Sequence, residues 1–448
     1  MSQLQATLPI ENEDLNPASL ASDKKARLSW KWISFLSLAF LAGVALRLSF
    51  VQDMEYKEDE QIDFLASQLK GGKDAWPWFG MPSGVYLVNP GMSLWVFTIL
   101  ARLFGIHHPT DLAHAVQAVA LMGMSLLVPF ALIWVAEQER KLWLWSFALA
   151  LVNPFLVLYH RKLWPEGFLP LFSVLILMGW WRKRSFFWAF LWGLSGACIG
   201  QIHMSGFFLS AACVLTTLIW DRKHTAWKGW FLGSTLGALP LIPWLIHIVQ
   251  HPVGHSMSVG WEEIQQLKFW VFWITDALGL HLGTSLGVHR GPHHFDQLAD
   301  FIRFPIVWGR PSYLVGVAHG VLAASGLGVL IELGKNRFTQ LRLSRPTKLV
   351  VTSAFLGCGI LLTLTGVAIR RYYLTSTFPL EFLSLVAAAN PNTRRGNFIL
   401  GAIWVCELII SINFVYYIHT HQGAPLGDYG QAYHLIESSE KNAHPELF

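Results

Sequence analysis

Residues 32–63 read WISFLSLAFLAGVALRLSFVQDMEYKEDEQID, an apolar segment followed directly by an acidic run. The apolar part, residues 32–50, is long enough to cross most of a bilayer as a helix. The acidic run that follows holds Asp53, Glu55, Glu58, Asp59, Glu60 and Asp63. Because charge is costly in hydrocarbon, this run must lie at the membrane surface or in a cavity that opens there. It is either a solvated cap on the first helix or part of a reaction centre.

The composition indicates a polytopic membrane protein. Hydrophobic residues make up 53% of the 448 residues and charged residues only 14%, which is too little charge for the surface of a soluble domain. The formal net charge is +5, but Lys and Arg cluster in short loops between apolar segments, so we infer no nucleic-acid partner. The four cysteines lie inside apolar stretches without metal-ligand spacing and are expected to be small buried residues.

About eleven segments fit the length of a spanning helix, roughly 20 residues. They lie near residues 31–51, 112–136, 142–159, 165–181, 186–201, 204–220, 229–249, 312–333, 348–368, 374–389 and 398–418. The expected fold class is therefore an all-α polytopic membrane protein. Residues 1–30 are expected to form a disordered cytosolic tail, residues 31–420 the transmembrane domain, and residues 421–448 an extracytoplasmic tail.

Basic residues predict the orientation, because cytosolic loops of membrane proteins carry an excess of Lys and Arg. With the N-terminus in the cytosol, every predicted cytosolic loop is basic. The acidic run and two long loops, residues 52–111 and 250–311, then lie outside. Two short outer loops, residues 160–162 (HRK) and 370–371 (RR), break the rule. Local violations are tolerated in membrane proteins, but a cation placed against the bias also suggests an anionic partner.

The first outer loop contains two expected interfacial helices. Residues 59–70 place Ile62, Leu65 and Leu69 on one face, which is typical of an amphipathic helix lying on the membrane. Residues 92–104 are apolar but too short to span the bilayer comfortably. Both helices would flank the membrane surface on the side of the acidic run.

The second outer loop is rich in histidine. Four of these residues suggest a metal site: His281, His289, His293 and His294. No HExxH motif or fixed ligand pair accompanies them. Whether a divalent metal binds is therefore left open, and the sequence indicates no other cofactor.

Several ionisable residues are expected to meet at the outer face. Asp59 and Glu60 follow the first span, Glu166 begins the fourth span behind Pro165, and His203 lies in the turn between the fifth and sixth spans. Pro165 suits a first helical turn, so the helix dipole should favour the ionised form of Glu166. Such carboxylates can act as a general base on a hydroxyl, while Arg or Lys holds a phosphate leaving group.

The chain resembles GT-C glycosyltransferases of the family 39 type, which include protein O-mannosyltransferases and bacterial aminoarabinose transferases. The resemblance covers nearly the whole chain. The residues that carry it are Arg47, Asp59-Glu60, Asn89-Pro90, residues 160–166, Arg371-Tyr372-Tyr373-Leu374 with Phe378-Pro379-Leu380, and Gly427-Asp428-Tyr429-Gly430. The donor and acceptor signatures of the second long loop are not recognisable, which leaves both substrates open.

The resemblance implies a polyprenyl-phosphate-linked sugar as donor, Asp59 as the catalytic base, and Glu60 beside it. Glu166 would be a further acidic site residue, and the acceptor would be a lipid, a glycan or a protein. The residues implied or suspected to hold the donor phosphate are Arg371, Arg370, Lys162 and Arg161. The remaining site candidates are His160, His203 and Tyr372. The other carboxylates of the acidic run are expected to be a solvated flank.

Two rival functions stay open. A transporter or lipid flippase would carry ionisable residues near the bilayer midplane, whereas here the charges gather at the outer ends of the spans. Glu332 and Glu407 are the nearest exceptions. A non-catalytic assembly subunit with a GT-C fold is the second rival. In each case we expect a multi-pass protein of the plasma or inner membrane, with its site facing the periplasm or the exterior.

Overall fold

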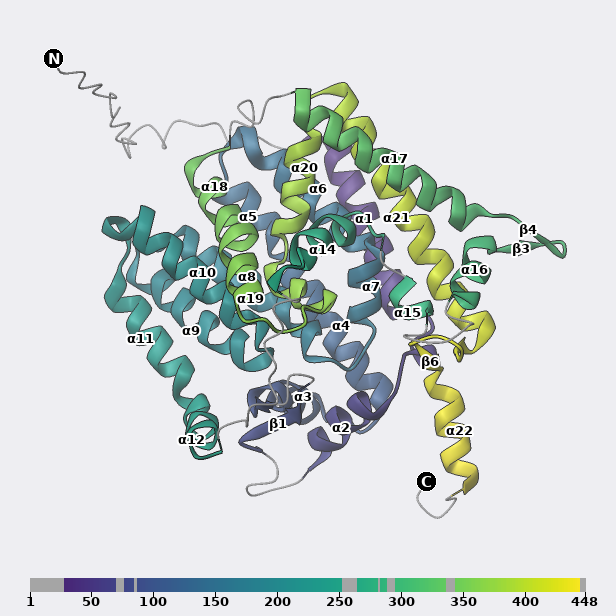
Figure 1. Cartoon of the computed structure of the whole chain (residues 1–448), viewed down its shortest axis with the longest axis horizontal. Helices are drawn as coiled ribbons and strands as arrows, with labels where there is room; N and C mark the ends of the chain where they lie inside the picture. Colours follow the sequence, from purple (N-terminus) through teal and green to yellow (C-terminus); the bar gives the residue numbers. More distant parts are fainter. Residues whose placement is uncertain are drawn as a thin grey trace.

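The computed structural model describes residues 28–69, 76–83, 87–251, 264–280, 283–287, 295–335 and 343–443. Within them the chain is almost entirely helical (Figure 1). Six helices or continuous helical stretches are long and apolar enough to span a membrane. They are α1 (Trp30–Leu48), α4 with α5 (Pro109–Ser125, Leu127–Ile133), α11 with α12 (Trp227–Ala238, Ile242–Gln250), α17 (Leu314–Lys335), α18 with α19 (Arg345–Thr352, Gly359–Leu364) and α21 (Arg394–His421).

The remaining expected spans are bent or short. Helices α6 (Glu137–Val152) and α7 (Pro154–His160) form one apolar stretch that bends by 57°. The other four are α8 (Leu169–Trp181), α9 (Phe186–Ile202), α10 (Ser205–Trp220) and α20 (Leu380–Ala389). The two tightly joined helices expected between residues 186 and 220 are confirmed as α9 and α10.

Three expected spans differ in detail from regular helices. The span expected at 374–389 is α-helical only in α20, because residues 371–377 form a 3₁₀ helix. Residues 165–168 also form a 3₁₀ turn ahead of α8. The stretch between α18 and α19, Ser353–Cys358, is π-helical.

The bend between α6 and α7 follows from the sequence Asn153-Pro154. Proline cannot donate a backbone hydrogen bond and its ring clashes with the preceding turn, so it breaks the helix. The side chain of Asn153 caps the second half by accepting hydrogen bonds from the backbone N–H groups of Phe155 and Leu156. Its amide donates to Glu407 on α21 at 2.6 Å. The bend therefore fixes α7, and the loop that follows it, against the core.

The other helices and the short strands belong mainly to the two long loops between the apolar helices and to the C-terminal segment. The helices are α2 (Glu58–Gln68), α3 (Met92–Phe104), α14 (Lys268–Ala277), α15 (Gly283–Leu286), α16 (Asp296–Arg303) and α22 (Tyr433–Ala443). Three antiparallel hairpins pair β1 (Phe79–Pro82) with β2 (Val88–Pro90), β3 (Ile306–Val307) with β4 (Arg310–Pro311), and β5 (Gly423–Ala424) with β6 (Gly430–Gln431). Helices α2 and α3 occupy the two interfacial segments expected from the sequence.

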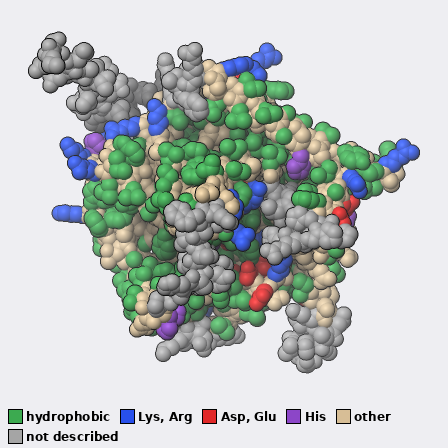
Figure 2. All heavy atoms as spheres, viewed as in Figure 1, with side chains coloured by type: hydrophobic (Ala, Val, Ile, Leu, Met, Phe, Trp, Pro, Cys, Tyr) green, Lys and Arg blue, Asp and Glu red, His purple; other side chains and the backbone are tan. Residues whose placement is uncertain are grey.

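Charge is distributed unevenly over the molecule. Basic side chains lie along the upper and left edges of the face in Figure 2 and also at its right edge and centre, and acidic side chains lie just below the centre and toward the right. Helices α2, α3 and α22 lie at the lower end in the same view (Figure 1).

Helices α9 and α11 pack closely along a stripe of small residues. Gly229, Gly233 and Gly237 recur every four residues on α11 and face α9. A Cβ on Gly233 would lie 2.0 Å from the carbonyl oxygen of Phe190. Such small-residue stripes let membrane helices approach to backbone contact.

We expect Gly233→Ala to destabilise the fold by about 1–3 kcal/mol, because the added methyl group forces α9 and α11 apart. Thermal unfolding of the purified protein in detergent measures the effect. Gly401→Ala on α21 is the matched control, since no atom of the described structure lies within 4 Å of its Cβ position. Equal melting temperatures for both variants would contradict the close packing.

Candidate functional site

Helix α2 presents Asp59 to a cavity and uses Glu60 as a cap. Glu60 Oε2 accepts a hydrogen bond from the backbone N–H of Lys57 at 3.0 Å, as in a capping box. Asp59 is exposed and lines the cavity. Partial burial and the neighbouring charge of Glu58 raise the pKa of Asp59. A raised pKa brings a carboxylate closer to the basicity that general-base catalysis needs near neutral pH.

Two carboxylates of α2 are fully buried. Glu60 and Asp63 both have 0% of their surface exposed. Burial, followed by the charge of Glu55, raises the pKa of Glu60 to about 7. Burial and the nearby carboxylates of Glu60 and Glu166 raise the pKa of Asp63 well above its ordinary value. Neither oxygen of Asp63 has a hydrogen-bond partner among the described residues, so the structure favours its protonated form.

Lys162 supplies the positive charge next to the acidic run. Its Nζ lies 2.5 Å from Oε2 of Glu55, whose Oε1 lies 2.7 Å from Lys57. The same ammonium group lies 4.2 Å from the ring centroid of Trp164. Burial alone would lower the pKa of Lys162, but the carboxylates of Glu55 and Glu60 outweigh it and raise the pKa. Lys162 therefore remains a cation between the acidic run and the cavity wall.

The expected solvated flank is largely wrong. It comprised four carboxylates: Asp53, Glu55, Glu58 and Asp63. Glu58 is exposed, as expected, but Asp53 is 3% exposed, Glu55 2% and Asp63 0%. The reason is that other segments cover the run, and the segment over Asp53 lies far away in the sequence.

Residues 419–434 provide this cover. His419 Nδ1 lies 2.7 Å from Oδ2 of Asp53, and His434 Nδ1 lies 3.2 Å from Oδ1. The Tyr429 hydroxyl donates a hydrogen bond to the backbone carbonyl of Asp53 at 2.6 Å. The C-terminal segment thus holds the chain that leads into α2.

A cavity of about 350 Å³ opens beside α2 and the β1–β2 hairpin. Its polar wall is formed by Asp59, Ser83, Asn89, Glu166, His203, Ser205, Thr365, Tyr372 and Tyr373. Its apolar wall is formed by Met81, Pro82, Leu87, Trp164, Pro165, Met204, Phe207, Phe208, Leu362 and Val367. No Lys or Arg belongs to the described lining. The cavity is therefore amphipathic, because its lining mixes acidic, hydroxyl and apolar side chains.

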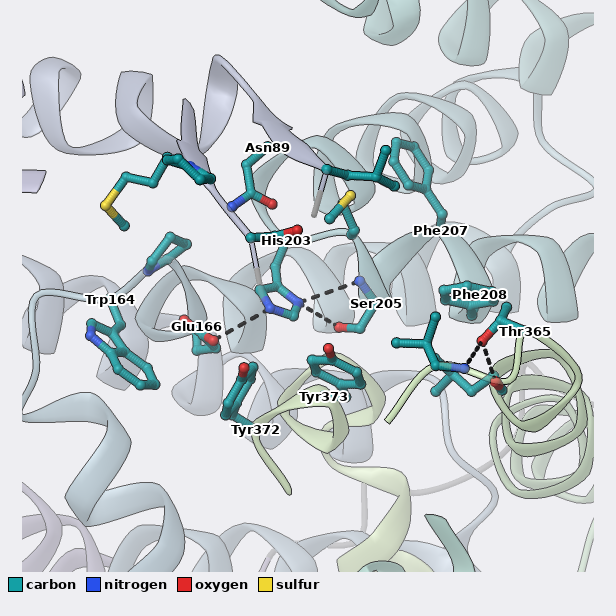
Figure 3. A pocket seen from close by; sticks show the side chains of 18 of the residues that line it. Asn89, Trp164, Glu166, His203, Ser205, Phe207, Phe208, Thr365, Tyr372 and Tyr373 are labelled. Carbon is teal, nitrogen blue, oxygen red and sulfur yellow. Dashed lines mark hydrogen bonds and ion pairs between the residues drawn. The ribbon is translucent and has the colours of Figure 1, made fainter. Parts of the chain in front are cut away.

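Glu166, His203 and Ser205 follow one another along this wall (Figure 3). Glu166 is 3% exposed and its Oε1 lies 3.4 Å from His203 Nε2. Glu166 lies behind Pro165 in the 3₁₀ turn that leads into α8, so the expected first helical turn is confirmed. The expected ionised form is wrong, because burial outweighs the helix end and raises the pKa of Glu166 to about 8. His203 Nδ1 lies 2.7 Å from the Ser205 hydroxyl oxygen. Burial lowers the pKa of His203 to about 4, so its ring is neutral at neutral pH.

Two of the expected site residues hold α1 in place. Arg161 is buried and donates hydrogen bonds to four backbone carbonyls around the C-terminal end of α1: Leu46, Arg47, Ser49 and Phe50. His160 is also buried, and its Nδ1 accepts a hydrogen bond from Arg47 Nε at 3.1 Å. Neither side chain lines the cavity. These contacts satisfy backbone carbonyls at the end of α1 that have no partner within the helix. Arg161 is therefore engaged with the backbone and is not placed to hold a phosphate, as was expected.

Arg371 lies in a buried ion pair. Its Nη1 contacts Oδ1 of Asp276 on α14 and donates to Thr275 Oγ1 at 3.1 Å. The guanidinium lies 4.4 Å from the ring centroid of Phe272. Asp276 is 1% exposed, and burial raises its pKa to about 7 in spite of the attraction of Arg371.

The expected phosphate-binding cations lie beside the cavity and not in its wall. Arg370 is exposed, and Arg371 is partly buried. The next two residues of the chain, Tyr372 and Tyr373, line the cavity. This connection puts both arginines close to one side of the cavity.

Three residues of this region were given no role in the sequence analysis: Asp63, Ser205 and Asp276. Asp63 lies one helical turn after Asp59, so its spacing could have placed it on the same face as the expected base. Ser205 follows His203 by two residues, a spacing typical of local turn contacts. Asp276 has no signal in the sequence, because its partner Arg371 lies in a different segment.

The four histidines that suggested a metal site cannot be placed in the described structure. His281, His289, His293 and His294 lie outside the described residues. Within the described residues, no group of three or more His, Cys, Asp or Glu side chains could hold a metal ion.

The fold is similar to that of solved membrane proteins. One is ArnT from Cupriavidus metallidurans in the apo state, with a TM-score of 0.50, 14% sequence identity, and an alignment covering 93% of this chain and 79% of ArnT. Another is ArnT from the same organism bound to undecaprenyl phosphate, with a TM-score of 0.51, 14% identity, and coverage of 94% and 81%. No protein-family model matches the sequence, and a search of curated proteins gave no match. The likeness shows the fold: the protein is an all-helical polytopic membrane protein with a GT-C-like fold.

We expect Asp63→Asn to stabilise the protein increasingly as pH rises. The folded state holds the Asp63 proton more tightly than the unfolded state, so wild-type stability falls once the pH exceeds the unfolded pKa, until the folded pKa is passed. Asparagine removes that cost. Thermal unfolding between about pH 5 and about pH 9 would show melting curves that separate with pH. The exposed Asp111→Asn is the control, and a constant difference for Asp63→Asn would rule out a buried titrating carboxyl.

Proposed function

We propose that the protein is an integral membrane glycosyltransferase. It moves a sugar from a polyprenyl-phosphate donor to a hydroxyl acceptor at the extracytoplasmic face, with Asp59 as the general base. The single observation that carries the proposal is that Asp59 and Glu166 line one amphipathic cavity in a GT-C-like fold. A structure of the similar ArnT contains undecaprenyl phosphate, which supports a lipid-phosphate donor here.

The cavity suits a substrate with a polar head and an apolar tail. Its polar wall offers Asp59 as a base with a raised pKa. Its apolar wall, which includes Phe207, Phe208 and Leu362, can cover the first part of a lipid chain. An acceptor hydroxyl placed beside Asp59 would lie within reach of a proton transfer.

The reaction is a single displacement at the anomeric carbon. Asp59 takes the proton of the acceptor hydroxyl, and the acceptor oxygen forms a bond to the anomeric carbon. The bond between that carbon and the phosphate oxygen breaks, and polyprenyl phosphate leaves with the electron pair. One displacement inverts the anomeric configuration.

Cations beside the cavity would stabilise the departing phosphate. Arg371 and Arg370 immediately precede the cavity residues Tyr372 and Tyr373, so a phosphate at that edge could meet either guanidinium. Binding by Arg371 would compete with its ion pair to Asp276. Lys162 contributes a positive field from behind Glu55. The buried backbone contacts of Arg161 leave it out of the proposed donor site.

The two charges that favoured a transporter have partners that suit helix packing. Glu407 accepts a hydrogen bond from Asn153 at 2.6 Å, across the bend between α6 and α7. Glu332 on α17 lies 3.0 Å from Arg395 on α21. These contacts join neighbouring helices, and we do not propose a transport function from them.

Replacing the base tests the proposed function directly. We expect Asp59→Asn to lower the transfer rate roughly 100-fold or more, because asparagine cannot accept the proton. The assay measures sugar transfer in membranes supplied with undecaprenyl-phosphate-linked sugars. Glu58→Gln is the matched control on the exposed side of the same helical turn. Wild-type turnover in Asp59→Asn would refute the base assignment.

The phosphate contact is tested by binding. We expect Arg371→Gln to weaken undecaprenyl phosphate binding roughly tenfold to a hundredfold, the scale of a charge-assisted hydrogen bond. That variant also leaves the carboxyl of Asp276 buried and unpaired, so the double variant Arg371→Gln/Asp276→Asn removes both charges together. Both variants should bind weakly, and Arg371→Lys should bind better than either. Unchanged affinity in the double variant would remove Arg371 from the donor site.

A further inference from the structure

The side chain of Ser205 is buried and lines the cavity. It is the first residue of α10, is 3% exposed, and belongs to the cavity wall. Its neighbours along that wall are His203 and Glu166 (Figure 3). The positions of the protons on these three side chains determine which of their atoms can donate a hydrogen bond to a ligand and which can accept one.

The contacts of His203 determine its tautomer. The backbone N–H of Ser205 points at His203 Nδ1 from 3.3 Å. A backbone N–H can only donate, so Nδ1 must carry a lone pair and the ring proton must be on Nε2. Nε2 faces Oε1 of Glu166 at 3.4 Å, and that oxygen can accept the Nε2 proton whether or not the carboxyl is ionised. The low pKa of His203 keeps the ring in this neutral form.

The same logic orients the Ser205 hydroxyl. Its oxygen lies 2.7 Å from Nδ1, and because Nδ1 accepts, the hydroxyl must donate to it. The proton of Ser205 is therefore occupied, and the lone pairs of its oxygen are left to accept a hydrogen bond from the cavity. Glu166 and His203 act through Ser205 and do not themselves need to touch the ligand.

A nucleophilic role for Ser205 does not fit the surrounding backbone. An acyl-transfer site needs free N–H groups to hold an oxyanion. The N–H of Ser205 points to His203 Nδ1, that of Gly206 to the His203 carbonyl, and that of Phe207 to the Met204 carbonyl. All three donors that follow the turn are occupied.

The rest of the wall matches a ligand that donates hydrogen bonds. Asp59 is a further acceptor, the rings of Tyr372 and Tyr373 flank His203, and no cation lies in the described lining. The lining combines acceptors, amide and hydroxyl groups and aromatic ring faces without a Lys or Arg, which suits the hydroxyl groups and apolar ring face of a sugar better than a charged phosphate. That chemistry is the chemistry of a carbohydrate.

We propose that Ser205 is the specificity residue of the cavity, whose hydroxyl oxygen accepts a hydrogen bond from one hydroxyl of the transferred sugar or of a sugar acceptor. His203 and Glu166 are positioning residues that hold the Ser205 proton. This inference rests on the proposed glycosyl transfer and specifies its substrate contact. The phosphate and the sugar then occupy different places, with the phosphate toward Arg370 and Arg371.

Binding of simple sugars tests the contact without requiring turnover. The protein in lipid nanodiscs is titrated with methyl glucoside, methyl mannoside and their monodeoxy analogues, and binding is followed by saturation-transfer NMR. We expect Ser205→Ala to weaken binding of one glycoside roughly three- to tenfold, the scale of one neutral hydrogen bond. One monodeoxy analogue should bind wild type and Ser205→Ala equally, since its missing hydroxyl is the partner of Ser205. Ser210→Ala, on the same helix and outside the cavity lining, is the matched control.

A second measurement detects the positioning roles. Nitrogen NMR of labelled histidine, with His203→Gln to identify the signal, should show protonated Nε2 and unprotonated Nδ1 in wild type. Glu166→Leu, which removes the acceptor opposite Nε2, should weaken binding of the same glycoside as Ser205→Ala does, whereas Glu166→Gln, which keeps an acceptor oxygen there, should bind it as wild type does. A protonated Nδ1 in wild type would overturn the proposal.

The remaining outcomes separate this inference from the proposed function. Glycoside binding that depends on Ser205, without any transfer from lipid-linked donors, supports the contact and removes the glycosyltransferase proposal. If Ser205→Ala and wild type transfer the sugar with the same KM, the glycosyltransferase proposal is supported and the Ser205 contact is refuted. Failure of wild type to bind any of the glycosides also overturns the contact.

Discussion

The ion pair between Lys162 and Glu55 joins the two halves of the site. Glu55 leads into α2, which carries Asp59, and Lys162 leads into the turn that carries Glu166. A buried pair of this kind is costly to assemble, and leaving either charge without its partner costs more. The pair therefore couples the position of the first outer loop to that of the loop after α7. The pair thereby ties the segment that carries the expected base to the segment that carries Glu166.

The sequence predicted the helical architecture and the position of α2, because hydrophobic length and helical periodicity are local properties. It also placed Asp59 at the head of that helix. It was wrong about Asp53, Glu55 and Asp63, which are buried. Burial depends on what covers a residue, and the cover over Asp53 comes from residues 419–434. No local pattern contains that information.

The same limit applies to the cations. Exceptions to the charge rule marked the loops at 160–162 and 370–371, and each contains a cation with a definite partner: Arg161 and Lys162 are buried, and Arg371 is partly buried. The rule could not say which partner each one has. Arg161 satisfies backbone carbonyls at the end of α1, whereas Arg371 faces Asp276. Arg161 caps the end of a helix and Arg371 lies beside the cavity, although both were singled out by the same exception to the charge rule.

The cover over Asp53 has a consequence for how the protein is made. The ribosome releases Asp53 long before Tyr429, which is 376 residues further along the chain. During synthesis Asp53 has neither His419 nor Tyr429 beside it until α21 and the segment that follows it have been made. Completion of the site is thus a late event of biogenesis, and a fusion partner attached near α22 would be placed against the very segment that completes it.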